Sequence, residues 1–136
     1  MYELKGNIVR KVFVGEGEGH MDFVCDDHIW RFEVDGDCCS ESWFSDVYNF
    51  GALIDSEVRS VSEVDMPSYN TEDGKCRQES DQVYGFEIYT GKGVATVVFR
   101  NSSNGYYGGS CKEGQMVRVA EGKEITGDWS SDGGVK

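Results

Sequence analysis

The chain has 136 residues, of which 38% are hydrophobic and 12% aromatic, and it carries a formal charge of −12 from 25 acidic and 13 basic side chains. This length and composition favour a single folded domain with one core and exclude separate cofactor and substrate domains. The net negative charge repels phosphate backbones, so we expect no direct binding to duplex DNA.

The beginning of the chain predicts neither export nor membrane insertion. It contains no basic segment followed by an apolar one, and no apolar run is long enough to span a bilayer. The five cysteines are an odd number, which favours reduced thiols over a disulfide framework. We therefore expect a cytoplasmic protein without a membrane partner.

Alternating apolar residues predict strands in the first half of the chain. The even positions of residues 2–14 are mostly apolar, which indicates a half-buried strand. Residues 21–25 and 30–34 also alternate, and the Asp26-Asp27 corner between them favours an antiparallel hairpin. Residues 42–47 are typical of an aromatic strand.

The next elements are shorter or less regular. Residues 49–54 predict a turn or two of helix, and the β-branched residues within 58–64 favour an irregular strand. Residues 66–82 are polar and include Pro67, so we expect an exposed loop there.

The clearest hairpin comes after this loop. Residues 84–88 alternate, a Thr90–Gly93 turn follows, and the β-branched run 94–99 is typical of a central strand buried on both faces. One last strand is expected around residues 117–119. The chain is thus predicted to form one β-rich domain over residues 1–126, with a polar tail over 127–136.

The predicted fold class is α+β and β-dominated. We expect an antiparallel sheet or a partly closed barrel with one short helix packed on it.

The segment that follows the central strand is the first candidate site. A guanidinium, amides, hydroxyls and two adjacent tyrosines could together hold an anionic, aromatic small molecule. The candidate residues in this segment are Arg100, Asn101, Ser103, Asn104, Tyr106 and Tyr107. Alternatively, Asn104-Gly105 forms an ordinary turn and the tyrosines close one end of the core.

The second candidate segment contains Cys38, Cys39, Trp43 and Phe44. Adjacent thiols on an extended backbone point in different directions, so one could face a site while Trp43 or Phe44 provides a stacking wall.

The sequence gives less support to catalysis and metal binding than to the binding of a small molecule. A nucleophilic thiol would need His20 or His28, and no spacing ties either histidine to Cys38 or Cys39. Zinc would need Cys25 and His28 together with other cysteines, but no paired CxxC motif occurs. The remaining candidates for such a zinc site are Cys38, Cys39, Cys76 and Cys111. We expect no catalytic residue, no metal and no cofactor.

Three stretches carry a family resemblance: GDCCSESWFSDV, FGALIDSEV and VATVVFRNSSNGYYGGS. Over roughly Phe23 to Cys111 the chain resembles a family of small phage and bacterial proteins, domain of unknown function 7448. The resemblance implies a phage-like origin and a β-rich fold without implying a mechanism. It also draws attention to residues 37–39 and 103–107 as one shared site.

Two binding functions fit these residues. The first is a non-enzymatic phage counter-defence protein in the host bacterial cytoplasm that sequesters a nucleotide-type immune signal. The alternative is an acidic anti-CRISPR or DNA-mimic protein that blocks a basic, nucleic-acid-binding host defence complex. An enzyme that cleaves such a nucleotide ranks last, because it would need His20, His28 or a carboxylate as general base. A free sheet edge could also pair with a second copy and give a homo-oligomer.

Overall fold

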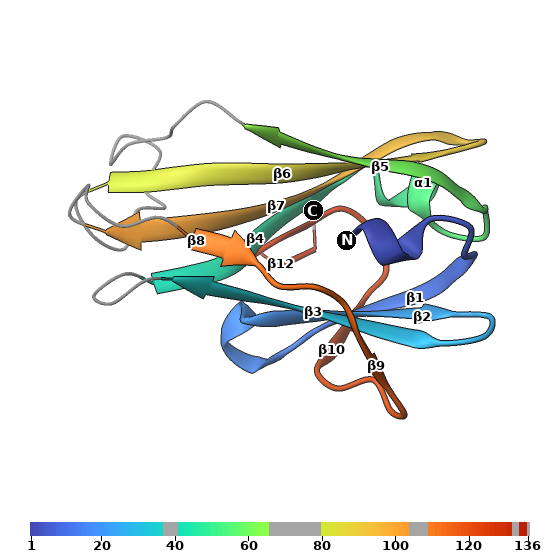
Figure 1. The fold of residues 1–136 in the computed structure, drawn as a ribbon, viewed down its shortest axis with the longest axis horizontal. Helices are drawn as coiled ribbons and strands as arrows, with labels where there is room; N and C mark the ends of the chain where they lie inside the picture. The colour runs from blue at the N-terminus through green and yellow to red at the C-terminus, as the bar shows by residue number, and fades with distance from the viewer. Residues whose placement is uncertain (37–40, 66–79, 104–108, 132–133, 136) are drawn as a thin grey trace.

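The structure is a computed structural model that describes residues 1–36, 41–65, 80–103, 109–131 and 134–135. Within these residues the fold consists of two antiparallel sheets and one short α-helix (Figure 1). The prediction of a β-dominated fold is therefore confirmed. In the part of the chain that the structure describes, the two sheets face each other across a shared core and do not form a closed barrel.

The first sheet has the strand order β10-β1-β2-β3-β8, and β9 also pairs with β3. Its strands are β1 (Val9–Val14), β2 (His20–Cys25), β3 (Ile29–Gly36), β8 (Gly109–Cys111), β9 (Gln115–Val117) and β10 (Lys123–Ile125). The predicted hairpin around Asp26-Asp27 is confirmed as β2 and β3.

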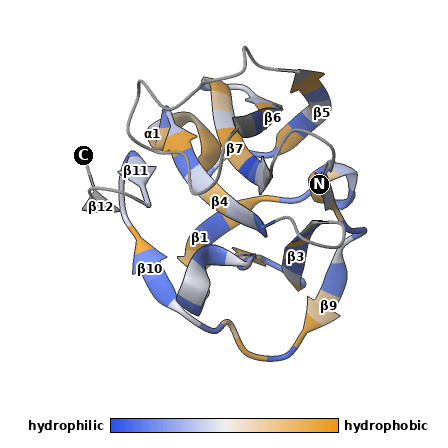
Figure 2. Cartoon of the chain, turned by 90° about the vertical axis from the view of Figure 1, so that its left-hand side faces the viewer, coloured by the Kyte–Doolittle hydropathy of each residue, from blue (hydrophilic) through white to orange (hydrophobic). Residues whose placement is uncertain are grey.

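The second sheet has the order β12-β11-β4-β7-β6-β5. Its strands are β4 (Glu41–Tyr48), β5 (Val58–Asp65), β6 (Ser80–Thr90), β7 (Gly93–Ser103), β11 (Trp129–Ser130) and β12 (Gly134–Val135). The short elements are the 3-10 turns η1 (Tyr2–Leu4) and η2 (Glu16–Glu18) and the helix α1 (Phe50–Leu53). Figure 2 shows both sheets nearly end-on, with the strands of the second sheet above those of the first.

One hydrophobic core lies between the sheets. Strand residues alternate between the two faces of a sheet, so each sheet turns every second side chain toward the other. Phe23 and Phe32 of the first sheet meet in an edge-to-face contact with ring centroids 5.6 Å apart. The second sheet contributes Val97 and Phe99, which are also buried in this core.

β7 is a central strand, as predicted, because it pairs with β4 on one side and β6 on the other. Its consecutive residues Val97, Val98, Phe99 and Arg100 are all buried, so both faces of the strand are covered. This burial on both faces explains the β-branched run in the sequence.

The structure corrects the prediction for the start of the chain. Tyr2–Leu4 form η1, and a strand begins only at Val9. Gly6 has φ = +85°, and its N–H donates to the Val58 carbonyl at 2.8 Å. This left-handed position interrupts the extended backbone between the apolar even positions.

The end of the chain also differs from the polar tail predicted over 127–136. Trp129 and Ser130 form β11, which pairs with β4, and Trp129 is buried in the core. Residues 66–79 of the predicted loop lie outside the described residues, and β6 begins at Ser80.

Candidate functional site

Arg100 and Trp43 lie directly opposite each other on β7 and β4. Directly opposite residues of an antiparallel pair project from the same face of the sheet. Val83 of β6 is opposite Arg100 on the other side, so it belongs to this face too. Arg100 and Trp43 are each only 2% exposed, which places a guanidinium next to an indole in a nearly water-free environment.

Phe44 projects from the opposite face and does not line this site. It is directly opposite Phe99, both are buried in the core, and their ring centroids are 6.2 Å apart. The side-chain period of a strand is two, so adjacent residues cannot form one wall. Of the two predicted stacking residues, Trp43 is the one on the same face as Arg100.

Asn101 is separated from Arg100 in the same way. It is fully buried, and the Ser42 hydroxyl lies 2.8 Å from its side-chain oxygen, on the face opposite to Arg100. Ser103 ends β7, opposite Ser80 of β6. Arg100 and Asn101 therefore do not converge on one ligand.

The face that carries Arg100 is unusually polar for a buried surface. Asp46 is 1% exposed and lies opposite both Val98 and Ser130, and Ser102 is fully buried next to this row. Charged groups are buried at a cost of several kcal/mol unless they are paired or hydrogen-bonded. We call Trp43, Asp46, Arg100, Ser102 and Ser130 the polar sheet face; each of them has an interaction partner.

The remaining predicted site residues lie outside the described residues: Cys38, Cys39, Asn104, Tyr106 and Tyr107. β4 begins at Glu41 and β7 ends at Ser103, and Glu41 is directly opposite Ser102. The strand ends next to the two predicted segments are thus neighbours in the sheet. The prediction that both segments form one site stays a prediction.

The described thiols are poorly suited to nucleophilic or metal chemistry. Burial raises the pKa of Cys25 to about 12 and that of Cys111 to about 11. A thiolate is the reactive and metal-binding form, so both groups are kept in their less reactive state at neutral pH. In the part of the chain that the structure describes, no three His, Cys, Asp or Glu side chains are grouped as metal ligands.

The sequence reasoning missed an ion-pair cluster on the outer face of the first sheet. Asp22 is fully buried, and its carboxylate accepts hydrogen bonds from Arg31 and from the backbone N–H of Glu121. His20 lies nearby, with Nε2 3.2 Å from the Glu121 carbonyl oxygen. The hairpin register could have revealed the Asp22 and Arg31 pair, because a turn at Asp26-Asp27 places them opposite each other.

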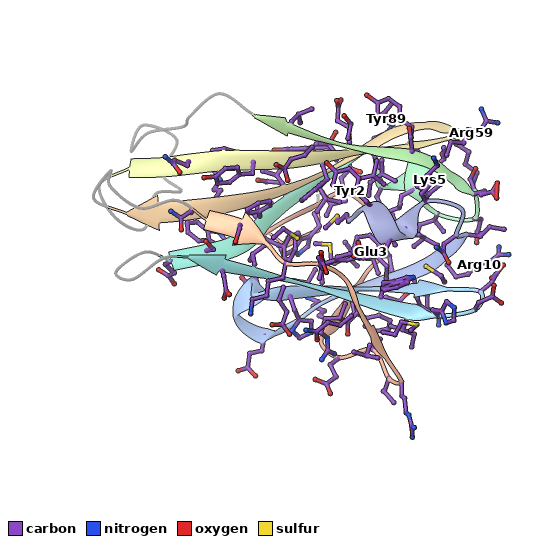
Figure 3. All side chains as sticks on the ribbon, in the orientation of Figure 1. Tyr2, Glu3, Lys5, Arg10, Arg59 and Tyr89 are labelled. Atoms are coloured by element: carbon purple, nitrogen blue, oxygen red, sulfur yellow. The ribbon has the colours of Figure 1, made fainter. Side chains whose placement is uncertain are left out.

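Exposed acids are partly neutralised by local pairs. Arg10, labelled in Figure 3, lies with Nε 2.8 Å from Asp26 and Nη1 3.0 Å from Asp55. The hydrogen bond from Arg10 lowers the pKa of the Asp26 carboxyl. Lys112 similarly meets Asp35 at 3.0 Å. Although the net charge is −12, basic side chains therefore neutralise acidic ones locally at these points of the surface.

Comparison with known proteins gives one match. A family model described as Domain of unknown function (DUF7448) matches residues 3–112, which run from η1 through β8. No curated protein and no solved structure matches. Among the described residues, no helix has the length and apolar character needed to cross a membrane.

Proposed function

This chain belongs to the family Domain of unknown function (DUF7448), and from this premise we propose that it is a non-enzymatic counter-defence protein of phage origin that sequesters a nucleotide-type signal. The phage origin rests on the sequence resemblance. The ligand class rests on the chemistry of the polar sheet face. The site of action would be the cytoplasm of the bacterial host.

The observation that carries the proposal is the pairing of Arg100 with Trp43. A guanidinium presents a planar fork of donors that fits a phosphate, and an indole stacks on a nucleobase. Arg100 and Trp43 are direct neighbours on one face of the sheet, so one ligand could contact both. Charge-assisted hydrogen bonds are stronger where water is excluded, and a ligand that makes them has to replace protein atoms that now cover Arg100 and Trp43.

Sequestration requires binding alone. Both residues belong to strands that are paired on both sides, which holds their backbones in fixed positions. Sites on such rigid elements are preorganised, so less conformational freedom is lost when a ligand binds.

Native mass spectrometry tests the proposal. The protein is incubated in an extract of defence-competent bacteria and, separately, with AMP, cyclic GMP and cyclic di-GMP. We expect a mass gain of one nucleotide per chain, which Arg100→Gln abolishes and Trp43→Phe weakens. Arg59→Gln is the matched control, since Arg59 is exposed at the other end of the sheet (Figure 3).

Thermal unfolding of each variant separates a lost ligand from a lost fold. A nucleotide gain that persists in folded Arg100→Gln contradicts the proposed site. A gain of a whole protein that disappears at high salt would instead support the acidic DNA-mimic function, because screening weakens contacts between exposed charges.

A further inference from the structure

A cavity lies between η2, the edge strand β10 of the first sheet and β11 of the second sheet. Its volume is about 420 Å³, within the range of small-molecule sites. Ser130 and Ser131 line part of it, and its apolar lining consists of Val14, Ile125 and Trp129. All three are buried core residues, so the cavity is an opening into the hydrophobic core between the sheets.

The rim of this cavity carries charges of both signs. Glu16 and Glu18 of η2 form part of the rim, and Lys123 of β10 forms another part. Lys123 is directly opposite Val14, so both side chains leave the first sheet on the side that faces the core. Within the described residues, none of these three side chains forms an ion pair.

Two glycines give the rim its shape. Gly122 has φ = +113°, and a Cβ at this position would collide with the Val14 carbonyl. A Cβ on Gly15 would collide with the His20 ring. Only glycine lets the backbone close this tightly around the opening, and the rim is thereby held against the end of β1.

We propose that this cavity binds a small ammonium carboxylate zwitterion with an apolar body, such as an apolar amino acid. Trp129 and Ile125 bury the apolar body. Glu16 and Glu18 attract its ammonium group, and Lys123 attracts its carboxylate. The three charged groups form no ion pairs with each other, so both halves of the zwitterion find an unpaired counter-charge.

The cavity borders the polar sheet face at Ser130, which lines the cavity and is opposite Asp46. Its apolar lining lies on the other face of β11, where Trp129 is opposite Val47 and points into the core. Lys123, Ile125 and Trp129 also lie beyond residue 112, outside the part of the chain that the family model matches. A zwitterion site here is therefore a property of this chain in addition to the proposed nucleotide binding.

Three matched ligands test the proposal: L-phenylalanine, 2-phenylethylamine, which lacks the carboxylate, and 3-phenylpropionate, which lacks the ammonium group. Binding is followed by the NMR shift of the Trp129 indole N–H, assigned with Trp129→Phe. We expect L-phenylalanine to bind best and the loss of either charge to weaken binding about threefold, as for pairs near a surface.

Two variants connect each charge to its counter-charge. Lys123→Gln should weaken L-phenylalanine about threefold without weakening 2-phenylethylamine. Glu16→Gln with Glu18→Gln should weaken the amine and leave 3-phenylpropionate no weaker. Glu124→Gln is the control, because Glu124 is opposite Phe13 and lies on the other face of β10.

Equal binding of all three ligands, or an unchanged ligand preference in Lys123→Gln, would overturn the zwitterion assignment. No shift of the Trp129 indole with any ligand at millimolar concentration would overturn the site itself. Nucleotide uptake through Arg100 is measured on the same Lys123→Gln protein. Whether this variant still takes up nucleotide does not depend on how it binds the three ligands. The two proposals can therefore fail separately.

Discussion

Arg31 binds the buried carboxylate of Asp22 in a bidentate contact across the β2 and β3 hairpin. Arg31 Nε donates to Asp22 Oδ1 and Nη2 donates to Oδ2, each at 2.8 Å. The second oxygen also accepts the Glu121 N–H at 2.9 Å. One carboxylate thus fastens the connection between β9 and β10 to the outer face of the first sheet.

We expect Asp22→Asn to lower the free energy of unfolding by about 3 kcal/mol, because the mostly buried Arg31 then keeps only its longer ion pair with the exposed Glu121, at 3.6 Å. Urea unfolding followed by tryptophan fluorescence measures this loss. Asp26→Asn is the control, since Asp26 pairs with Arg10 in an exposed position and should cost much less. Equal losses in the two variants would contradict a special role for Asp22.

Cys25 should make the protein less stable at alkaline pH. Burial raises its pKa from 9.0 to about 12, so the folded state holds the thiol proton more tightly than the unfolded chain does. The resulting stabilisation is complete below pH 9 and is lost as the pH rises toward 12. We expect Cys25→Val to flatten the decrease in unfolding free energy over this range.

The comparison of wild type and Cys25→Val isolates this thiol, because the other titrating groups are present in both proteins. Urea unfolding at pH 7, 9 and 10.5 gives the three points required. If both proteins lose stability with the same slope, Cys25 is not the group responsible.

Phe44 and Trp43 should respond differently to substitution, since adjacent residues of β4 project from opposite faces. Phe44→Leu removes part of a buried ring that contacts Phe99, and should cost about 1 kcal/mol of stability. It should leave nucleotide uptake unchanged, whereas Trp43→Phe should weaken that uptake. The experiment combines urea unfolding with native mass spectrometry, and a matching loss of uptake in Phe44→Leu would contradict the assignment of faces.

Local sequence patterns were enough to predict much of the fold. The β2 and β3 hairpin, the β6 and β7 hairpin and α1 each follow from alternation and turn residues within a short stretch of chain. The pairings of β10 with β1 and of β11 with β4 join segments far apart in the sequence. No periodicity within a segment specifies such partners.

The candidate site shows the same limit. The sequence indicates Arg100 as a site residue because it comes directly after a β-branched run. Grouping it with Asn101 and Phe44 does not take into account that side chains alternate between the two faces of a strand. The register pairs Arg100 with Trp43 and turns Asn101 and Phe44 to the other face. The cavity beside Trp129 could not be predicted at all, since η2 and β11 reach it from opposite ends of the chain.

Trp129 should be as important for stability as a residue in the middle of the chain. It is 7% exposed, packs in the core between the sheets and is opposite Val47 on β4. We expect Trp129→Ala to lower the unfolding free energy by about 3 kcal/mol, the low end for a buried tryptophan, because one side of the indole borders the cavity. Trp129→Phe keeps most of the apolar contact and should cost clearly less. Urea unfolding of both variants can be followed through Trp30 and Trp43, and a cost near zero for Trp129→Ala would mean that β11 detaches from β4 in solution.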